Sequence, residues 1–266
     1  MKIFEIRDGA SALVRGYLFY YERSGRFYAE LPDQLNEWDV PAMFYGHAKR
    51  CEYSVDHNWA MKWVRQRIIP AERQNIASIL KANHLRVYDE YRLLRLSEGR
   101  CAQDDDHIVE IDAGMLPEKI TLRLMRKLED VLPLSGFRIL AFFRDGNTRL
   151  IELKKFLRDE RMFSAILSDE ERFLHVKLSP GGNGIEWDAE RFIAAEQLYA
   201  AGHEIALRRE DLLTFARERL LDTSKLSERL GVSRQYIKQL TDKDKLHPVL
   251  STAATQFYAA AEIESE

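Results

Sequence analysis

Polar and basic side chains gather over a short stretch near the C-terminus, residues 233–245. Arg and Gln can match the edges of bases with two hydrogen bonds at once, whereas Ser and Lys suit phosphate oxygens. The residues of this stretch whose types fit double-stranded DNA are Ser233, Arg234, Gln235, Tyr236, Lys238, Gln239, Lys243 and Lys245. We expect Arg234 and Gln235 to be the chief contacts to bases, with Lys243 or Lys245 on phosphates.

The residues around this stretch predict two short helices joined by a tight turn, over 223–240. Thr223 or Ser224 can cap the first helix, and Ser233 the second, by accepting an orphan backbone N–H. Gly231 stands where the first helix must end, because glycine adopts the left-handed cap conformation without strain. Apolar residues recur at helical spacing, namely Leu226, Leu230, Ile237 and Leu240, with Val232 in the turn. The pattern predicts a helix-turn-helix, although two helices at this spacing can also be purely structural.

Residues 208–250 resemble the helix-turn-helix of the MerR and excisionase type, through the segment SRQYI and the tail DKLHPV. The resemblance implies a DNA-binding domain in which a β-hairpin wing follows His247-Pro248-Val249. The segment STAATQFYAAAEI, which stands there, lacks the basic residues usual in that wing, and Ser227 replaces a commoner Ala. The presence of a wing is therefore left open. A further helix is expected over 209–221, with an apolar face made of Leu212, Leu213, Phe215, Ala216, Leu220 and Leu221.

The middle of the chain, residues 130–202, alternates like a small β-rich domain. Two apolar runs flank Asp145-Gly146, a hairpin signal. FLHVKL is expected as a third strand and IEW as a fourth, with the glycines at 181, 182 and 184 in a turn. Through FFRDGN, FLHVKL, GIEWD and EQLY, this part resembles a bacterial domain-of-unknown-function family numbered 2442. That resemblance implies no activity, but the family is associated with helix-turn-helix and toxin–antitoxin contexts.

The N-terminal part begins with strands and continues with helices. Residues 12–31 predict a β-hairpin around Ser24-Gly25, with its aromatic residues in a sheet core. Helical spacing runs from Trp59 to Leu96, and Pro70 is expected to begin a helix. Pro117–Leu128 predicts another helix with proline at its start, and Asp104–Asp106 an exposed acidic loop.

Residues 63–106 resemble, more loosely, the N-terminal subdomain of HipA-type toxin kinases, through WVRQRIIP and DEYRLLRLSEGRC. Arg100 stands where that family has an acidic residue, and no kinase catalytic loop is present. The resemblance therefore implies a non-catalytic interaction fold. Arg65, Arg67, Arg73 and Arg100 are candidates for a second surface that binds an anionic ligand, although basic helical faces are more often only solvated.

Metal and cofactor chemistry are not expected. Cys51 and Cys101, together with His47, His57 and His107, lack the paired short spacings of a zinc site. The glycines at 181–184 lack the Lys-Ser/Thr of a phosphate-binding loop. We expect no enzyme, since no catalytic constellation is legible.

Composition sets the frame for these motifs. The chain has 266 residues, 45% of them hydrophobic, and a formal charge of −3, so DNA binding must come from a local patch. No signal peptide or membrane span is evident, and a cytoplasmic bacterial protein is expected. We expect an α+β chain of three domains: an N-terminal α+β domain over 1–128, a small β-rich domain over 129–202 and a helix-turn-helix domain over 203–266. The function predicted is that of a homodimeric transcription regulator, of a toxin–antitoxin or mobile-element locus. The alternative is a protein-interaction adaptor or antitoxin acting by direct protein contact.

Overall fold

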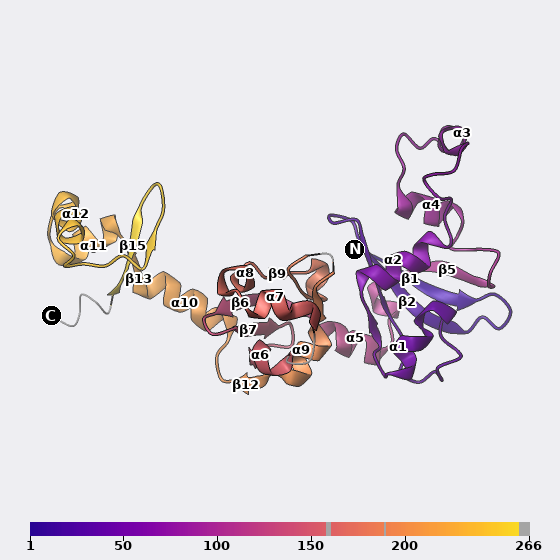
Figure 1. Ribbon diagram of the computed structural model, residues 1–266, viewed down its shortest axis with the longest axis horizontal. Coiled ribbons are helices and arrows are strands. Elements are labelled where there is room, and N and C mark those ends of the chain that lie inside the picture. The colour runs from indigo at the N-terminus through magenta and orange to yellow at the C-terminus, as the bar shows by residue number, and fades with distance from the viewer. Residues whose placement is uncertain (158–160, 189, 261–266) are drawn as a thin grey trace. The chain divides into compact units, whose positions relative to one another are not determined.

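The computed structural model describes residues 1–157, 161–188 and 190–260 (Figure 1). It is a mixed α+β structure with several antiparallel sheets, as predicted. The chain divides into two compact units, Met1–Glu204 and Ile205–Glu266. The predicted boundary at 128/129 falls inside the first unit and stays a prediction.

A five-stranded antiparallel sheet organises the first half of this unit, in the order β4-β3-β2-β1-β5. Its strands are β1 Lys2–Asp8, β2 Val14–Tyr21, β3 Arg26–Glu30, β4 Ser54–Val55 and β5 Asp106–Ile111. The predicted hairpin is confirmed, since β2 pairs with β3 around Gly25, whose φ is 66°. Ile3 of β1, which lies between β2 and β5, is opposite Phe19 and Ile111.

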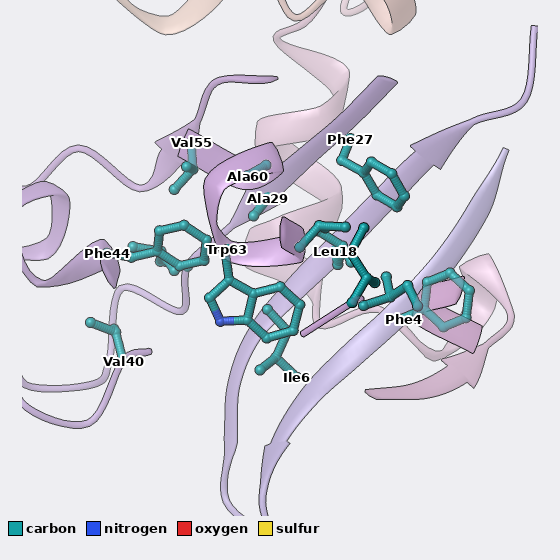
Figure 2. Packing of buried hydrophobic residues seen from close by; sticks show 14 of the residues in the cluster. Phe4, Ile6, Leu18, Phe27, Ala29, Val40, Phe44, Val55, Ala60 and Trp63 are labelled. Atoms are coloured by element: carbon teal, nitrogen blue, oxygen red, sulfur yellow. The ribbon is translucent and has the colours of Figure 1, made fainter. Parts of the chain in front are cut away.

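Side chains alternate across this sheet, and both faces are covered. Phe4, Ile6 and Leu18 face a core that includes Phe44 and Trp63 (Figure 2). Ile3, Tyr17 and Phe19 face the other way and pack with Ile120. The period of two along each strand produces this division, because successive side chains point to opposite faces. The aromatic residues of the hairpin therefore belong largely to the cores, as expected.

The helical part of the first half is more broken than its spacing predicts. Its helices are η1 Ala42–Phe44, α1 Tyr45–Lys49, α2 His57–Arg65, α3 Ile76–Ala82, α4 Glu90–Leu96, η2 Ala113–Met115 and α5 Glu118–Met125. The expectation that Pro70 begins a helix is wrong, since residues 66–75 form turns and α3 starts at Ile76. The start of α5 after Pro117 is confirmed.

The acidic run is exposed only in part, since Asp105 is exposed in a loop while Asp104 is half-buried and Asp106 is buried. Asp106 is 1% exposed and opens β5, where it contacts Arg15 at 3.0 Å and Arg67 at 3.4 Å. Asp104 contacts Arg67 at 2.5 Å. Arg67 is itself buried, so it does not belong to a surface for anionic ligands. These carboxylates neutralise a buried cation, which explains why they are not left in water.

The second half of the unit contains two further sheets, ordered β12-β8-β7-β6 and β11-β10-β9. Their elements are β6 Leu128–Leu134, β7 Arg138–Phe143, β8 Thr148–Glu152, α6 Leu153–Phe156, η3 Arg161–Phe163, α7 Ser164–Leu167, α8 Glu170–Leu174, β9 Lys177–Leu178, η4 Pro180–Gly182, β10 Gly184–Glu186, β11 Phe192–Ala194, α9 Ala195–Ala201 and β12 His203–Ile205. The hairpin at Asp145-Gly146 is confirmed. The strand expected over FLHVKL shrinks to β9, because its first residues end helix α8.

The second unit is small. It comprises α10 Arg209–Arg219, β13 Leu220–Asp222, α11 Thr223–Leu230, α12 Arg234–Asp242, β14 Leu250–Ser251 and β15 Gln256–Ala259. Its core is formed by Leu221, Leu226, Ile237, Leu246, Tyr258 and Ala260. The helix expected over 209–221 ends at Arg219, and no residue of α10 is buried, whereas Leu221 lies in β13 and belongs to the core.

Candidate nucleic-acid interface

The first helix of the pair, α11, is fixed at both ends by local hydrogen bonds. Its N-cap is Asp222, whose carboxylate accepts from the N–H groups of Ser224 and Lys225, both at 2.8 Å. The expected cap at Thr223 or Ser224 is therefore displaced by one or two residues. Asp suits this position because its charge also complements the helix dipole. Gly231 ends the helix in the left-handed conformation, with φ 66°, as predicted.

Side-chain hydrogen bonds stabilise the turn between α11 and α12. Ser227 Oγ donates to the backbone oxygen of Val232 at 2.5 Å, which gives a role to the serine that stands in place of alanine. Ser233 caps α12 as predicted, since its hydroxyl accepts from the N–H of Tyr236 at 3.2 Å. Ile237 is fully buried and anchors α12 in the core. The first turn of α12 is thereby held at its surface position.

A β-hairpin formed by β14 and β15, the wing, follows α12, and the unit has the order β13-α11-α12-β14-β15. β15 lies between β13 and β14, with Leu221 opposite Tyr258 and Leu250 opposite Phe257. The hydroxyl of the buried Tyr258 lies 3.0 Å from Thr241 Oγ1 of α12. A hairpin therefore stands where the resemblance placed a wing. Its segment 250–260 contains no Lys or Arg.

A groove of about 690 Å³ runs between α12 and the wing. Arg234, Lys238 and Asp242 line one side, because residues four apart lie on the same face of a helix. The other side and the floor are polar or small: Asp222, Thr223, Ser224, Thr252, Ala253, Ala254, Thr255, Gln256 and Tyr258. The groove can accept an anion on the side of Arg234 and Lys238. The carboxylates of Asp222 and Asp242, which also line the groove, would repel an anion.

All eight residues predicted for DNA contact are exposed. They do not share one face. Arg234 and Lys238 face the groove, Gln235 and Gln239 form the next stripe of α12, and Tyr236 lies on a third. Within the described part of the chain, the side chains of Arg234, Lys238, Lys243 and Lys245 form no ion pair. These cations are available to phosphates without first breaking an internal contact.

The residues on the wing side of the groove were not among those predicted to contact DNA. Thr252, Thr255 and Gln256 supply hydroxyl and amide groups there. The only sequence signal was the tail DKLHPV, after which the family of the resemblance carries its wing. Polar neutral residues give no charge pattern, so spacing alone could not have found them.

The described residues contain neither a cluster of metal ligands nor a helix that could span a membrane. Among the described residues, no group of three or more His, Cys, Asp or Glu side chains is placed to hold a metal ion. Cys51 is exposed, and both cysteines are free thiols. The described helices are all too short or too polar to cross a membrane.

Comparison with known proteins gives one family match. Residues 128–204 match the family described as a protein of unknown function, DUF2442. The match covers the four-stranded and three-stranded sheets of the second half of the first unit and agrees with the resemblance over 130–202. No curated protein and no solved structure matches the chain.

Proposed function

We propose that the second unit binds double-stranded DNA through α12 and the groove beside it, and that the protein is a transcription regulator. The observation that carries this proposal is the exposed first turn of α12, with Arg234 and Lys238 unpaired beside a winged-helix groove. A capped surface helix of this kind suits the major groove, whose base edges Arg and Gln can contact. We further propose a homodimer, because one short recognition helix contacts too few bases for a specific site.

The second candidate function is that of a protein-interaction adaptor. It is favoured by the exposure of Leu230, Tyr236, Val249 and Leu250, at 39%, 47%, 58% and 52%. Exposed apolar side chains of this size suit a protein partner better than a phosphate backbone. Asp222 and Asp242 in the groove also favour a protein partner over DNA, since their carboxylates repel phosphates.

Selection from random DNA duplexes with the full-length protein separates the two functions. The DNA-binding proposal expects one enriched sequence and an affinity that falls steeply with salt. The adaptor function expects no enriched sequence, and the double variant Arg234→Ala/Lys238→Ala then leaves nonspecific DNA affinity unchanged. That pair of results would overturn the DNA-binding proposal.

A further inference from the structure

A cleft of about 440 Å³ lies within the first unit, between its two halves. The segment around α1 and β4 forms one wall and contributes His47, Glu52 and Asp56. β11 and the start of α9 form the other wall, which includes Phe192 and Glu196. A volume of this size falls in the range of about 300–1,000 Å³ that small-molecule sites occupy. DNA binding by the second unit makes no use of this cleft.

The side chains that carry a charge in the lining of the cleft at neutral pH are acidic: Glu52, Asp56 and Glu196. Glu52 is paired with Arg50 at 2.7 Å. Asp56 caps α2 by accepting from the N–H of Trp59 at 3.0 Å, a contact that leaves its charge uncompensated. Neither Asp56 nor Glu196 forms an ion pair within the described part of the chain. Two carboxylates therefore lack a counter-charge beside a volume that could hold a cation.

A smaller pocket adjoins the cleft and contains cations, namely Arg123, Arg126 and Lys127. Arg123 and Lys127 are neutralised by Glu30, at 3.1 Å and 2.6 Å. Arg126 lies near Glu196 but does not line the larger cleft. The two unpaired carboxylates thus outweigh one nearby guanidinium, so the cleft favours a cation over an anion.

His47 is an independent sign that the cleft takes a ligand. It is 7% exposed, and its ring forms no hydrogen bond with another described residue. Its ring nitrogens are not among the polar atoms sealed from solvent without a partner, so they reach the surface, which here is the cleft wall. Burial lowers the pKa of this imidazole below 6.5, so at neutral pH one nitrogen can accept a hydrogen bond. A buried acceptor that opens on a cleft without a partner suits a ligand that donates one.

Apolar side chains complete the lining. Phe192 is half-buried and lines the cleft together with Ala194 and Ala200. This wall can contact methylene groups, whereas the carboxylates and His47 can accept from N–H groups. We propose that the cleft binds a small organic cation, a short alkyl amine or guanidine.

Calorimetric titration of the full-length protein with putrescine, agmatine and succinate tests the proposal. The two cations are expected to bind, and less tightly as the salt concentration rises. Succinate has as many carbons as putrescine but two negative charges, and is expected not to bind. Glu196→Gln and Asp56→Asn should each weaken the binding of putrescine about tenfold, and Asn keeps the cap of α2. Glu171→Gln, exposed on α8 and outside the cleft, is the matched control and keeps the wild-type affinity.

Cys51 provides a second measurement, because this free thiol is exposed and lines the cleft. Putrescine should slow the alkylation of Cys51 by iodoacetamide, followed by mass spectrometry. Cys101 lies outside the cleft, so its rate of alkylation should not change. His47→Leu removes the buried acceptor and should weaken both the binding and the protection of Cys51.

Three results would overturn the proposal. They are the failure of both cations to bind in the millimolar range, equal binding of succinate, and an affinity for putrescine that Glu196→Gln and Asp56→Asn leave unchanged. Because Glu196 is exposed, its variant is expected to fold, so an unchanged affinity in it cannot be attributed to misfolding. The cleft and the recognition helix belong to different units, so either proposal can fail without the other.

Discussion

Arg234 is the residue on which specific DNA binding is expected to depend most. It occupies the first turn of α12, exposed, with its guanidinium beside the groove. We predict that Arg234→Ala costs about 1–3 kcal/mol of binding free energy on the selected sequence and relaxes its specificity. Fluorescence anisotropy with the selected duplex and a scrambled duplex measures both effects.

Lys243 provides the matched control for Arg234. It ends α12 as an exposed cation, away from the first turn. Lys243→Ala should weaken binding to both duplexes equally and reduce the slope of log affinity against log salt by about one. If the two variants behaved alike on both duplexes, Arg234 would not distinguish bases.

His47 makes the stability of the first unit sensitive to acid. It is 7% exposed, and burial lowers the pKa of its imidazole below the ordinary value of 6.5. The pKa of the nearby His57 is lowered for the same reason. Between its lowered value and 6.5, the unfolded chain takes up a proton that the folded chain does not. We predict that stability falls as the pH drops below about 6.5, by at most about 1.4 kcal/mol per pH unit for each histidine.

Urea denaturation at pH 7.5, 6.5 and 5.5 measures this slope. His47→Gln should flatten it, because one of the two neutral imidazoles is gone. His175→Gln should leave it unchanged, since His175 is exposed. A slope that is the same in both variants would show that His47 does not titrate in this range.

At the scale of the element, the helix pair α11 and α12 depends on a very small core. Ile237 is fully buried among six core residues in a unit of this size. Deleting a buried Ile side chain typically costs about 2–5 kcal/mol, a large share of what so small a domain possesses. We predict that Ile237→Ala unfolds the second unit and abolishes DNA binding while the first unit stays folded.

Limited proteolysis and thermal unfolding followed by circular dichroism measure that effect. Tyr236→Ala, next in the chain but 47% exposed, is the matched control and should unfold at nearly the wild-type temperature. A cooperative loss of both units in Ile237→Ala would contradict the independence of their cores.

The elements that sequence predicted well are those determined by local chemistry. Gly25, Gly146 and Gly231 each end up at positive φ, and Ser233 caps α12. The elements it missed depend on distant partners. Residues 66–75 do not continue a helix because Arg67 turns inward to Asp104 and Asp106. The apolar spacing of α10 was visible, but spacing cannot tell whether a face meets its own core or another chain.

The candidate site likewise has one side that local sequence predicts and one side that depends on distant partners. Its α12 side was predictable, because a cap followed by basic and amide residues is a local pattern. The wing side was not, because β15 is held to the rest of the unit by pairing with β13, some 35 residues earlier in the chain. The Thr241–Tyr258 hydrogen bond that joins the wing to α12 likewise links residues whose proximity no spacing reveals.

At the scale of the whole molecule, a buried cluster of charged side chains joins the two halves of the first unit. It links the first half of that unit to the start of its second half. Glu30 of β3 is 2% exposed, and its carboxylate lies 2.6 Å from Lys127 Nζ and 3.1 Å from Arg123 Nε. Ser54 of β4 donates to the same carboxylate at 2.9 Å. Lys127 is the residue directly before β6, so the cluster joins the five-stranded sheet to the part that matches the family of unknown function.

Removing the carboxylate should therefore loosen this junction. In Glu30→Gln, the ammonium of Lys127 stays buried, with its side chain 4% exposed, but loses its counter-charge. Breaking a buried ion pair on one side costs about 3–5 kcal/mol, because the remaining charge stays desolvated. Asp33→Asn is the matched control, because it breaks an ion pair with Lys119 of α5, whose side chain is 55% exposed. It should lower the free energy of unfolding by at most about 1 kcal/mol, since exposed ion pairs contribute little. Glu30→Gln combined with Lys127→Met should recover part of the loss, because the stranded cation is removed as well. Urea unfolding of the four proteins distinguishes the cases, and a Glu30→Gln variant no less stable than Asp33→Asn would show that the cluster does not hold the junction.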